Sequence, residues 1–122
     1  QWLSLSILTP LSIIGFFSIS KNRKLSQIQI VTIPESKIHH QQFFEDIYIT
    51  TKNNQVRFLS AKCSHLGCHI NKLKNDELIC PCHGSKFTVE GKVIQGPANK
   101  NLHFLAFEYI AEEKKYLVYK ST

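Results

Sequence analysis

The chain has 122 residues, which is enough for one modest domain and one additional element but not for two full domains. Its formal net charge is +6 at pH 7, yet the lysines are spread along the chain without a long basic block. Because the sequence also lacks a helical reader or an ordered basic and aromatic platform, we exclude nucleic-acid binding and assign the charge to solvated strand edges or a docking surface for an acidic partner.

The N-terminal stretch, residues 1–20, contains no charged side chain. Its apolar bulk comes from Trp2, Leu3, Leu5, Ile7, Leu8, Leu11, Ile13, Ile14, Phe16, Phe17 and Ile19. Such a length can cross the hydrocarbon core of a bilayer, and its Pro10 and serines are tolerated when a spanning helix packs against others. We therefore predict a transmembrane anchor helix over residues 1–20, a linker over 21–27 and one domain over 28–122. The alternatives are a signal-peptide core and a buried helix of a soluble protein.

The remaining chain predicts an all-β, antiparallel domain. Residues 27–33 alternate polar and apolar side chains as a half-buried strand does, and Pro34 ends them. Three hairpins follow: residues 46–61 around Asn53 and Asn54, residues 86–95 around Gly91, and residues 103–119 around 112–114. Residues 73–77 are typical of a turn. Phe43 and Phe44 fit either a short helix or an irregular crossing strand.

Two short segments contain all four cysteines. Box one, residues 63–68, reads Cys-Ser-His-Leu-Gly-Cys, and box two, residues 80–85, reads Cys-Pro-Cys-His-Gly-Ser. A [2Fe–2S] cluster in which two histidines replace two cysteines on one iron needs one cysteine and one histidine from each of two loops. The pattern provides this set, because thiolates suit one iron and neutral imidazoles the other.

The residues around these ligands fit the same interpretation. Gly67 and Gly84 suit positions with positive φ or without room for a Cβ, and Pro81 stiffens box two. Ser85 offers a hydroxyl to a cluster sulfur.

A structural zinc site would leave two cysteines or histidines without a role, and two plain disulfides would leave both histidines unexplained. The histidines outside the boxes have no second ligand set, and we expect surface or packing roles for His39, His40, His69 and His103.

Over residues 56–110 the sequence resembles the Rieske iron–sulfur proteins, specifically the high-potential, disulfide-containing branch of cytochrome bc-type complexes. The resemblance implies that the metal ligands are Cys63, His65, Cys80 and His83, and that Cys68 and Cys82 form a disulfide. Residues 96–98, Gly-Pro-Ala, resemble the family's third loop, so Pro97 is expected to cover the cluster.

Phe87 departs from the family pattern, in which high-potential members usually carry a tyrosine at this position. A phenylalanine ring cannot donate a hydrogen bond, and hydrogen bonds to cluster or ligand sulfurs raise the reduction potential. We therefore predict an intermediate potential within the Rieske range of about −150 to +300 mV, matched to a low-potential donor such as menaquinol.

The resemblance implies an electron-transfer subunit of a larger, quinol-oxidising membrane complex of a respiratory chain. His83 is expected to meet a quinol bound in a cytochrome b subunit and to receive its proton, with Leu66 forming part of the apolar rim. The electron would pass to a c-type cytochrome. The alternatives are the small subunit of a periplasmic molybdenum enzyme similar to arsenite oxidase, and a soluble Rieske ferredoxin.

Two signals conflict over which side of the membrane holds the domain. Lys21, Arg23 and Lys24 follow the predicted anchor, and the positive-inside rule alone would place the domain in the cytoplasm. A structural disulfide belongs instead to an oxidising compartment. We give the disulfide more weight and predict a single-pass protein of the inner or energy-transducing membrane, with the cluster on the periplasmic side.

Overall fold

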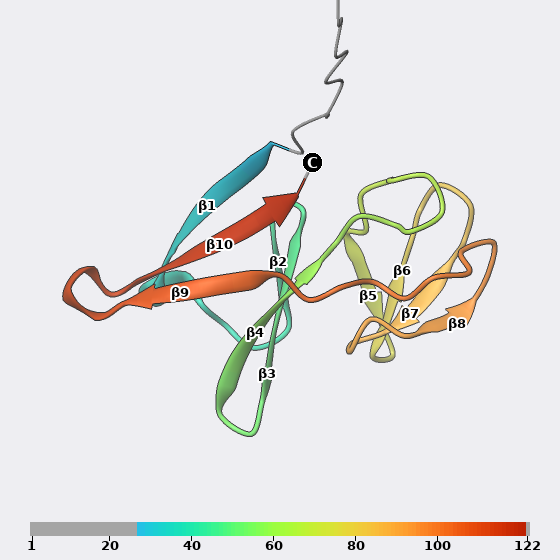
Figure 1. Ribbon diagram of the computed structural model, residues 1–122. Coiled ribbons are helices and arrows are strands. Elements are labelled where there is room, and N and C mark those ends of the chain that lie inside the picture. The colour runs from blue at the N-terminus through green and yellow to red at the C-terminus, as the bar shows by residue number, and fades with distance from the viewer. Residues whose placement is uncertain (1–26, 122) are drawn as a thin grey trace, which may run out of the picture.

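The computed structural model describes residues 27–121, which form three small antiparallel sheets (Figure 1). The antiparallel β architecture predicted from the sequence is confirmed. The predicted anchor over residues 1–20 lies outside the described residues. Residues 27–121 contain no helical segment that could span a bilayer.

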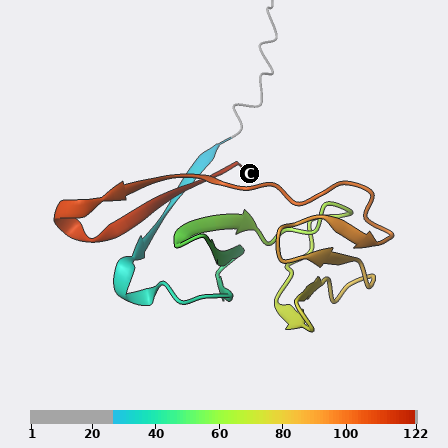
Figure 2. The same cartoon turned by 90° about the horizontal axis from the view of Figure 1, so that it is seen from below.

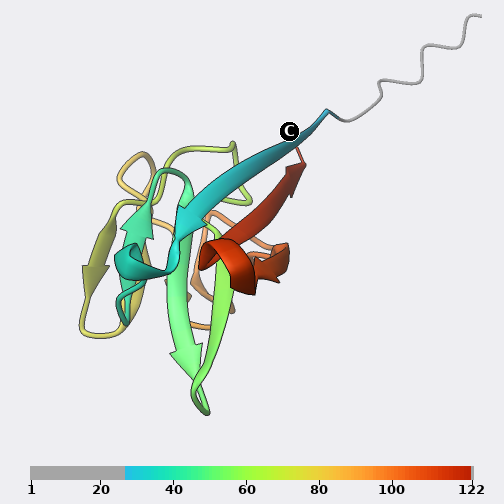
Figure 3. The same cartoon turned by 90° about the vertical axis from the view of Figure 1, so that its left-hand side faces the viewer.

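The first sheet has the strand order β1-β10-β9. β1 (Ile28–Pro34) pairs along its whole length with β10 (Lys115–Ser121), which also pairs with β9 (Ala106–Ile110). Short 3-10 turns, η1 (Glu35–Lys37) and η2 (Ala111–Glu113), follow β1 and β9. The turn between β9 and β10 faces the viewer in Figure 3.

The alternation in β1 correctly predicts a strand, but the first two isoleucines lie on the solvent side. Ile33 is fully buried and Val31 packs against the same core, whereas Ile28 and Ile30 are 67% and 58% exposed. Side chains of a strand alternate between its two faces, so the odd-numbered positions face inward here. Which face of β1 is buried depends on its packing against β10 and β3, and the local sequence pattern does not indicate it.

The second sheet, of order β2-β3-β4, lies between two cores. β3 (Ile47–Lys52) and β4 (Gln55–Ser60) are joined by Asn53 and Asn54, whose φ values of 52° and 60° confirm the predicted turn. Ile47 and Ile49 face the first sheet, and Tyr48, between them, faces the third. Phe43 and Phe44 belong to β2 (Gln42–Phe44), so the strand alternative holds for them.

The third sheet, of order β5-β6-β7-β8, supports both boxes and lies beside the other two (Figure 2). Its strands are β5 (Lys72–Lys74), β6 (Glu77–Ile79), β7 (Lys86–Thr88) and β8 (Val93–Gln95). The turn predicted over residues 73–77 is narrower in the structure, because only Asn75 and Asp76 form it and the residues before them pair as the short strand β5. β5 is an outer strand whose Lys72 and Lys74 are exposed.

Gly91 lies where the third sheet meets the second. It has φ +84°, and a Cβ there would lie 2.9 Å from Leu59 Cδ1 and 3.1 Å from the Leu102 carbonyl oxygen. Its amide and carbonyl bond Thr88 and Leu102. Both the backbone conformation and the close approach therefore require glycine at this turn.

Tyr48 buries its hydroxyl in the core between the second and third sheets. Within the described residues this hydroxyl has no hydrogen-bond partner. Burial, with a smaller contribution from the charge of Asp76, raises the pKa of Tyr48 to about 12. The phenol therefore stays neutral at any physiological pH.

Candidate metal centre

The two boxes fold into loops with the same backbone hydrogen bonds. The Cys63 amide donates to the Cys68 carbonyl and the Cys80 amide to the Ser85 carbonyl, both at 2.8 Å. The Gly67 and Gly84 amides donate back to the carbonyls of Cys63 and Cys80, at 2.8 and 3.2 Å. The two loops are thus approximate copies, each starting on a buried cysteine.

The glycines owe their place in these loops to backbone conformation. Gly67 has φ +76° and Gly84 φ +78°, a region that residues with a Cβ rarely adopt. An added Cβ would meet no atom within 4 Å at either position. The positive φ therefore explains why these two positions are glycine, and a lack of space for a Cβ does not.

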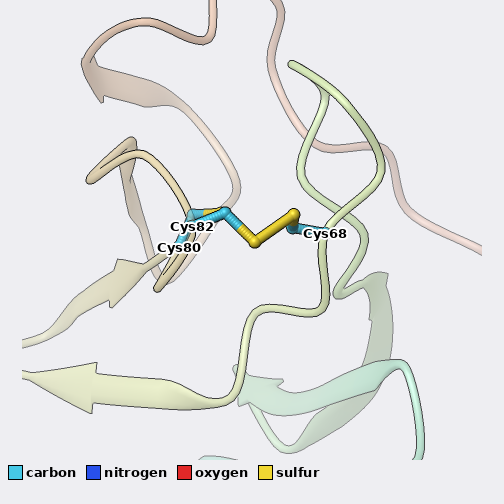
Figure 4. Close-up of side chains that lie close together, drawn as sticks. All are labelled: Cys68, Cys80 and Cys82. Atoms are coloured by element: carbon cyan, nitrogen blue, oxygen red, sulfur yellow. A yellow bond between two sulfur atoms is a disulfide. The ribbon is translucent and has the colours of Figure 1, made fainter.

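A disulfide between Cys68 and Cys82 joins the loops (Figure 4). It is the pairing that the resemblance implied. Cys63 and Cys80 remain free thiols, 4% and 1% exposed. The Cys80 sulfur lies within 4.8 Å of both disulfide sulfurs, but disulfide sulfurs are not thiolates, so these three cysteines do not form a metal site by themselves.

The histidines of the two boxes come together at the exposed end of the loops. The ring centroids of His65 and His83 are 5.2 Å apart and the rings are perpendicular. Both residues are exposed, and Leu66 beside them is 70% exposed. The site therefore has a buried sulfur side and a solvent-facing nitrogen side.

The third loop packs against box two through Ser85. The Ala98 amide donates to Ser85 Oγ at 3.0 Å, and Ser85 is fully buried. Since Oγ accepts this bond, its own hydrogen remains available as a donor. Pro97 is exposed and follows a cis peptide bond after Gly96.

Three polar contacts that the sequence did not predict hold this loop in place. The Ser64 hydroxyl donates to the Lys100 carbonyl at 2.5 Å, and Gln95 Nε2 donates to the Gly84 carbonyl at 3.4 Å. Asn101 Oδ1 accepts from the Val93 amide at 3.0 Å. No local signal marks these side chains, because each partner is determined by tertiary structure.

The donor set fits a [2Fe–2S] group with mixed ligation. Two free thiols are buried on one side, two imidazoles converge on the other, and a buried hydroxyl lies next to box two. Phe87 is fully buried in the core that also contains Cys63 and Cys80. Its ring packs there without offering a polar hydrogen to the sulfurs.

Comparisons with known proteins agree with this donor set. A family model described as the Rieske [2Fe-2S] domain matches residues 23–109. The cytochrome b6-f complex iron-sulfur subunit of Chlorobaculum thiosulfatiphilum is 35% identical over 83 residues, which cover 62% of this chain and 46% of that protein. The chloroplastic subunit of the same name from Fritillaria agrestis is 46% identical over 59 residues, which cover 47% of this chain and 25% of that protein.

Among solved structures, the plasma membrane Rieske protein PetC3 from Synechocystis PCC 6803 is 32% identical with a TM-score of 0.49, and the alignment covers 59% of this chain and 74% of that one. The chain spans less than half of the length of both curated relatives. The family model covers most of the chain, and its description names a [2Fe-2S] domain, which agrees with one [2Fe–2S] cluster as the cofactor. The chain therefore belongs to the family of Rieske [2Fe–2S] domain proteins.

Proposed function

We propose that the chain is the membrane-anchored electron-transfer subunit of a quinol-oxidising complex, acting with a cytochrome b-type subunit and not catalytic alone. It accepts an electron and a proton from quinol, and it passes the electron to a c-type cytochrome. The names of the curated relatives, iron-sulfur subunits of cytochrome b6-f complexes, support this class of complex.

The observation that carries the proposal is the paired loop geometry of the two boxes. In this assignment Cys63 and Cys80 bind one iron and His65 and His83 the other, while the disulfide keeps the loops together. The buried thiols provide a dry sulfur side, and the exposed imidazoles provide the only ligands that a partner molecule could reach directly. Bound in this way, the cluster exchanges one electron at a time.

His83 is the proposed proton acceptor. It is exposed, and one nitrogen of an imidazole can bind metal while the other remains free to form a hydrogen bond. When this second nitrogen has lost its own hydrogen, as metal ligation favours, it accepts a hydrogen bond from a quinol hydroxyl and can take that proton, which leaves His83 as a ligated neutral imidazole. Leu66 provides an apolar surface next to it, which suits a quinol ring and its surrounding protein wall.

The proposed location is an energy-transducing membrane, with the domain on the periplasmic side and residues 1–20 as a single-pass anchor. The Cys68–Cys82 disulfide supports the oxidising side of the membrane. The uncharged apolar stretch before Lys21 supports the anchor.

Electron paramagnetic resonance of the reduced membrane fraction tests this function. We expect a rhombic Rieske spectrum that changes when an inhibitor of the quinol site is added, because the inhibitor would contact His83. A Rieske spectrum that does not change with the inhibitor would favour the two alternatives, the small subunit of a periplasmic molybdenum enzyme or a soluble Rieske ferredoxin. The absence of a Rieske spectrum from membranes containing the full chain would contradict the proposal.

Restoring a hydroxyl near the sulfurs tests the predicted intermediate potential. Phe87→Tyr is expected to raise the midpoint potential, because a phenol in this core can donate to a ligand sulfur and stabilise the reduced state. Protein-film voltammetry measures the shift. The matched control is Tyr48→Phe, which removes a hydroxyl from the same core and is expected to leave the midpoint unchanged. A wild-type midpoint near the upper end of the Rieske range would contradict the prediction.

A further inference from the structure

A nearly buried ion pair joins Asp46, which precedes β3, to Lys120 of β10, 74 residues later in the chain. Asp46, 6% exposed, lies between β2 and β3, and its Oδ1 accepts from Lys120 Nζ at 2.5 Å. The Lys120 side chain is only 13% exposed. On the other side of the carboxylate, Lys62 Nζ lies 3.6 Å from Oδ2. Glu45 adds an outer contact of 3.9 Å to Lys120.

The backbone carbonyl of Asp46 is hydrogen-bonded to the segment that leads from β4 into box one. Its carbonyl accepts from the Ala61 amide at 2.7 Å, and the Ala61 carbonyl accepts from the Ile70 amide at 2.7 Å. Lys62 and His69 form the next bridge, and the Cys63 amide closes the loop on Cys68. The segment that enters box one is therefore bonded to Asp46 directly through Ala61, and the segment that leaves it is linked to Asp46 through the bond between Ile70 and Ala61.

Net stability alone does not account for an ion pair at this place. Desolvation offsets most of the Coulomb energy of a buried pair, and apolar residues of similar size often stabilise a fold equally well. A charged pair instead fixes position, since losing one partner leaves the other buried and uncompensated. Here the fixed position is the strand end that leads into Cys63.

We propose that Asp46 is a positioning residue of the metal centre, which holds the Cys63 arm of box one through Ala61 and Lys62 and balances the Lys62 charge next to it. This inference rests on the proposed ligand role of Cys63. Reduction adds one electron to the site, so a nearby carboxylate opposes it and a nearby ammonium favours it.

The test uses Asp46→Asn in the full, cluster-loaded chain in membranes or detergent. We expect a higher midpoint potential, with the ratio of reduced to oxidised protein at fixed applied potential rising roughly two- to tenfold. The resonance lines of the reduced protein should shift, and the Ala61 and Ile70 amides should exchange hydrogen roughly tenfold faster. Glu113→Gln removes the same charge at the far β9–β10 turn and should change none of these measurements.

A second variant keeps the proposal testable should Asp46→Asn fail to hold the cluster. Lys62 is 44% exposed, so Lys62→Gln should fold, and it is expected to lower the midpoint. An unchanged midpoint and unchanged resonance lines in either loaded variant would overturn the positioning role, even with a lower melting temperature. A normal Rieske spectrum in the unmodified chain would leave the proposed function standing in that case.

Discussion

Replacing His83 by alanine is expected to abolish the cluster. The variant loses one of the two proposed nitrogen ligands, and box two contains no other histidine that could take its place. Iron and acid-labile sulfide in the purified protein should fall to near zero, and the Rieske resonance should disappear. The loops should still be joined by the disulfide, because Cys68 and Cys82 are unaffected.

His69→Ala is the matched control for this loss. His69 is also exposed, and it directly follows box one, where its backbone forms a bridge with Lys62. Its side chain has no proposed ligand role, so the variant should keep full iron content and an unchanged spectrum. Cluster loss in His69→Ala, or retention in His83→Ala, would contradict the ligand assignment.

Removing the disulfide should have the second largest effect. Cys68 and Cys82 are 14 residues apart in sequence, and a cross-link closing a loop of this size stabilises a protein by about 3 kcal/mol. In Cys68→Ser/Cys82→Ser we expect the unfolding free energy to fall by about that amount. The disulfide is the covalent link between the two loops, so loss of iron to a chelator should be much faster without it. Urea titration and the decay of visible absorbance measure the two effects.

The unmodified chain provides the control for the double variant. Mild thiol reduction of the wild type should reproduce the faster iron loss, while the same reductant should leave the rate of the double variant unchanged. Equal rates of iron loss in the oxidised wild type and the double variant would show that the disulfide does not hold the loops.

Local sequence predicted the hairpins well, because their turns use residues with a specific backbone preference. Asn53 and Asn54 adopt the left-handed conformation that their short side chains tolerate, and Gly91 does so at the next hairpin. Which side chains of β1 are buried could not be predicted from the local sequence. Ile28 and Ile30 look like core residues by composition, but the pairing of β1 with β10 buries Val31 and Ile33 instead.

In the candidate site, too, residues close together in the sequence could be predicted, whereas contacts between distant residues could not. Spacing within the boxes was sufficient to group the cysteines and histidines, because each loop spans only a few residues. Asp46 and Lys120 were missed, since 74 residues separate them and neither lies in a recognisable pattern. Nothing near Asp46 in the sequence indicates that its carbonyl supports box one, a contact that exists only after β3 and β4 pair.

Among the strands that the structure describes, β5 lies at an outer edge of the third sheet, which matters where the protein is concentrated. A free strand edge invites a second copy to add its own strand, which starts aggregation. β5 is only three residues long, and Lys72 and Lys74 flank its central Leu73. Two copies meeting edge to edge would bring four ammonium groups together, so mutual repulsion keeps neighbouring molecules from joining their sheets at high local concentration.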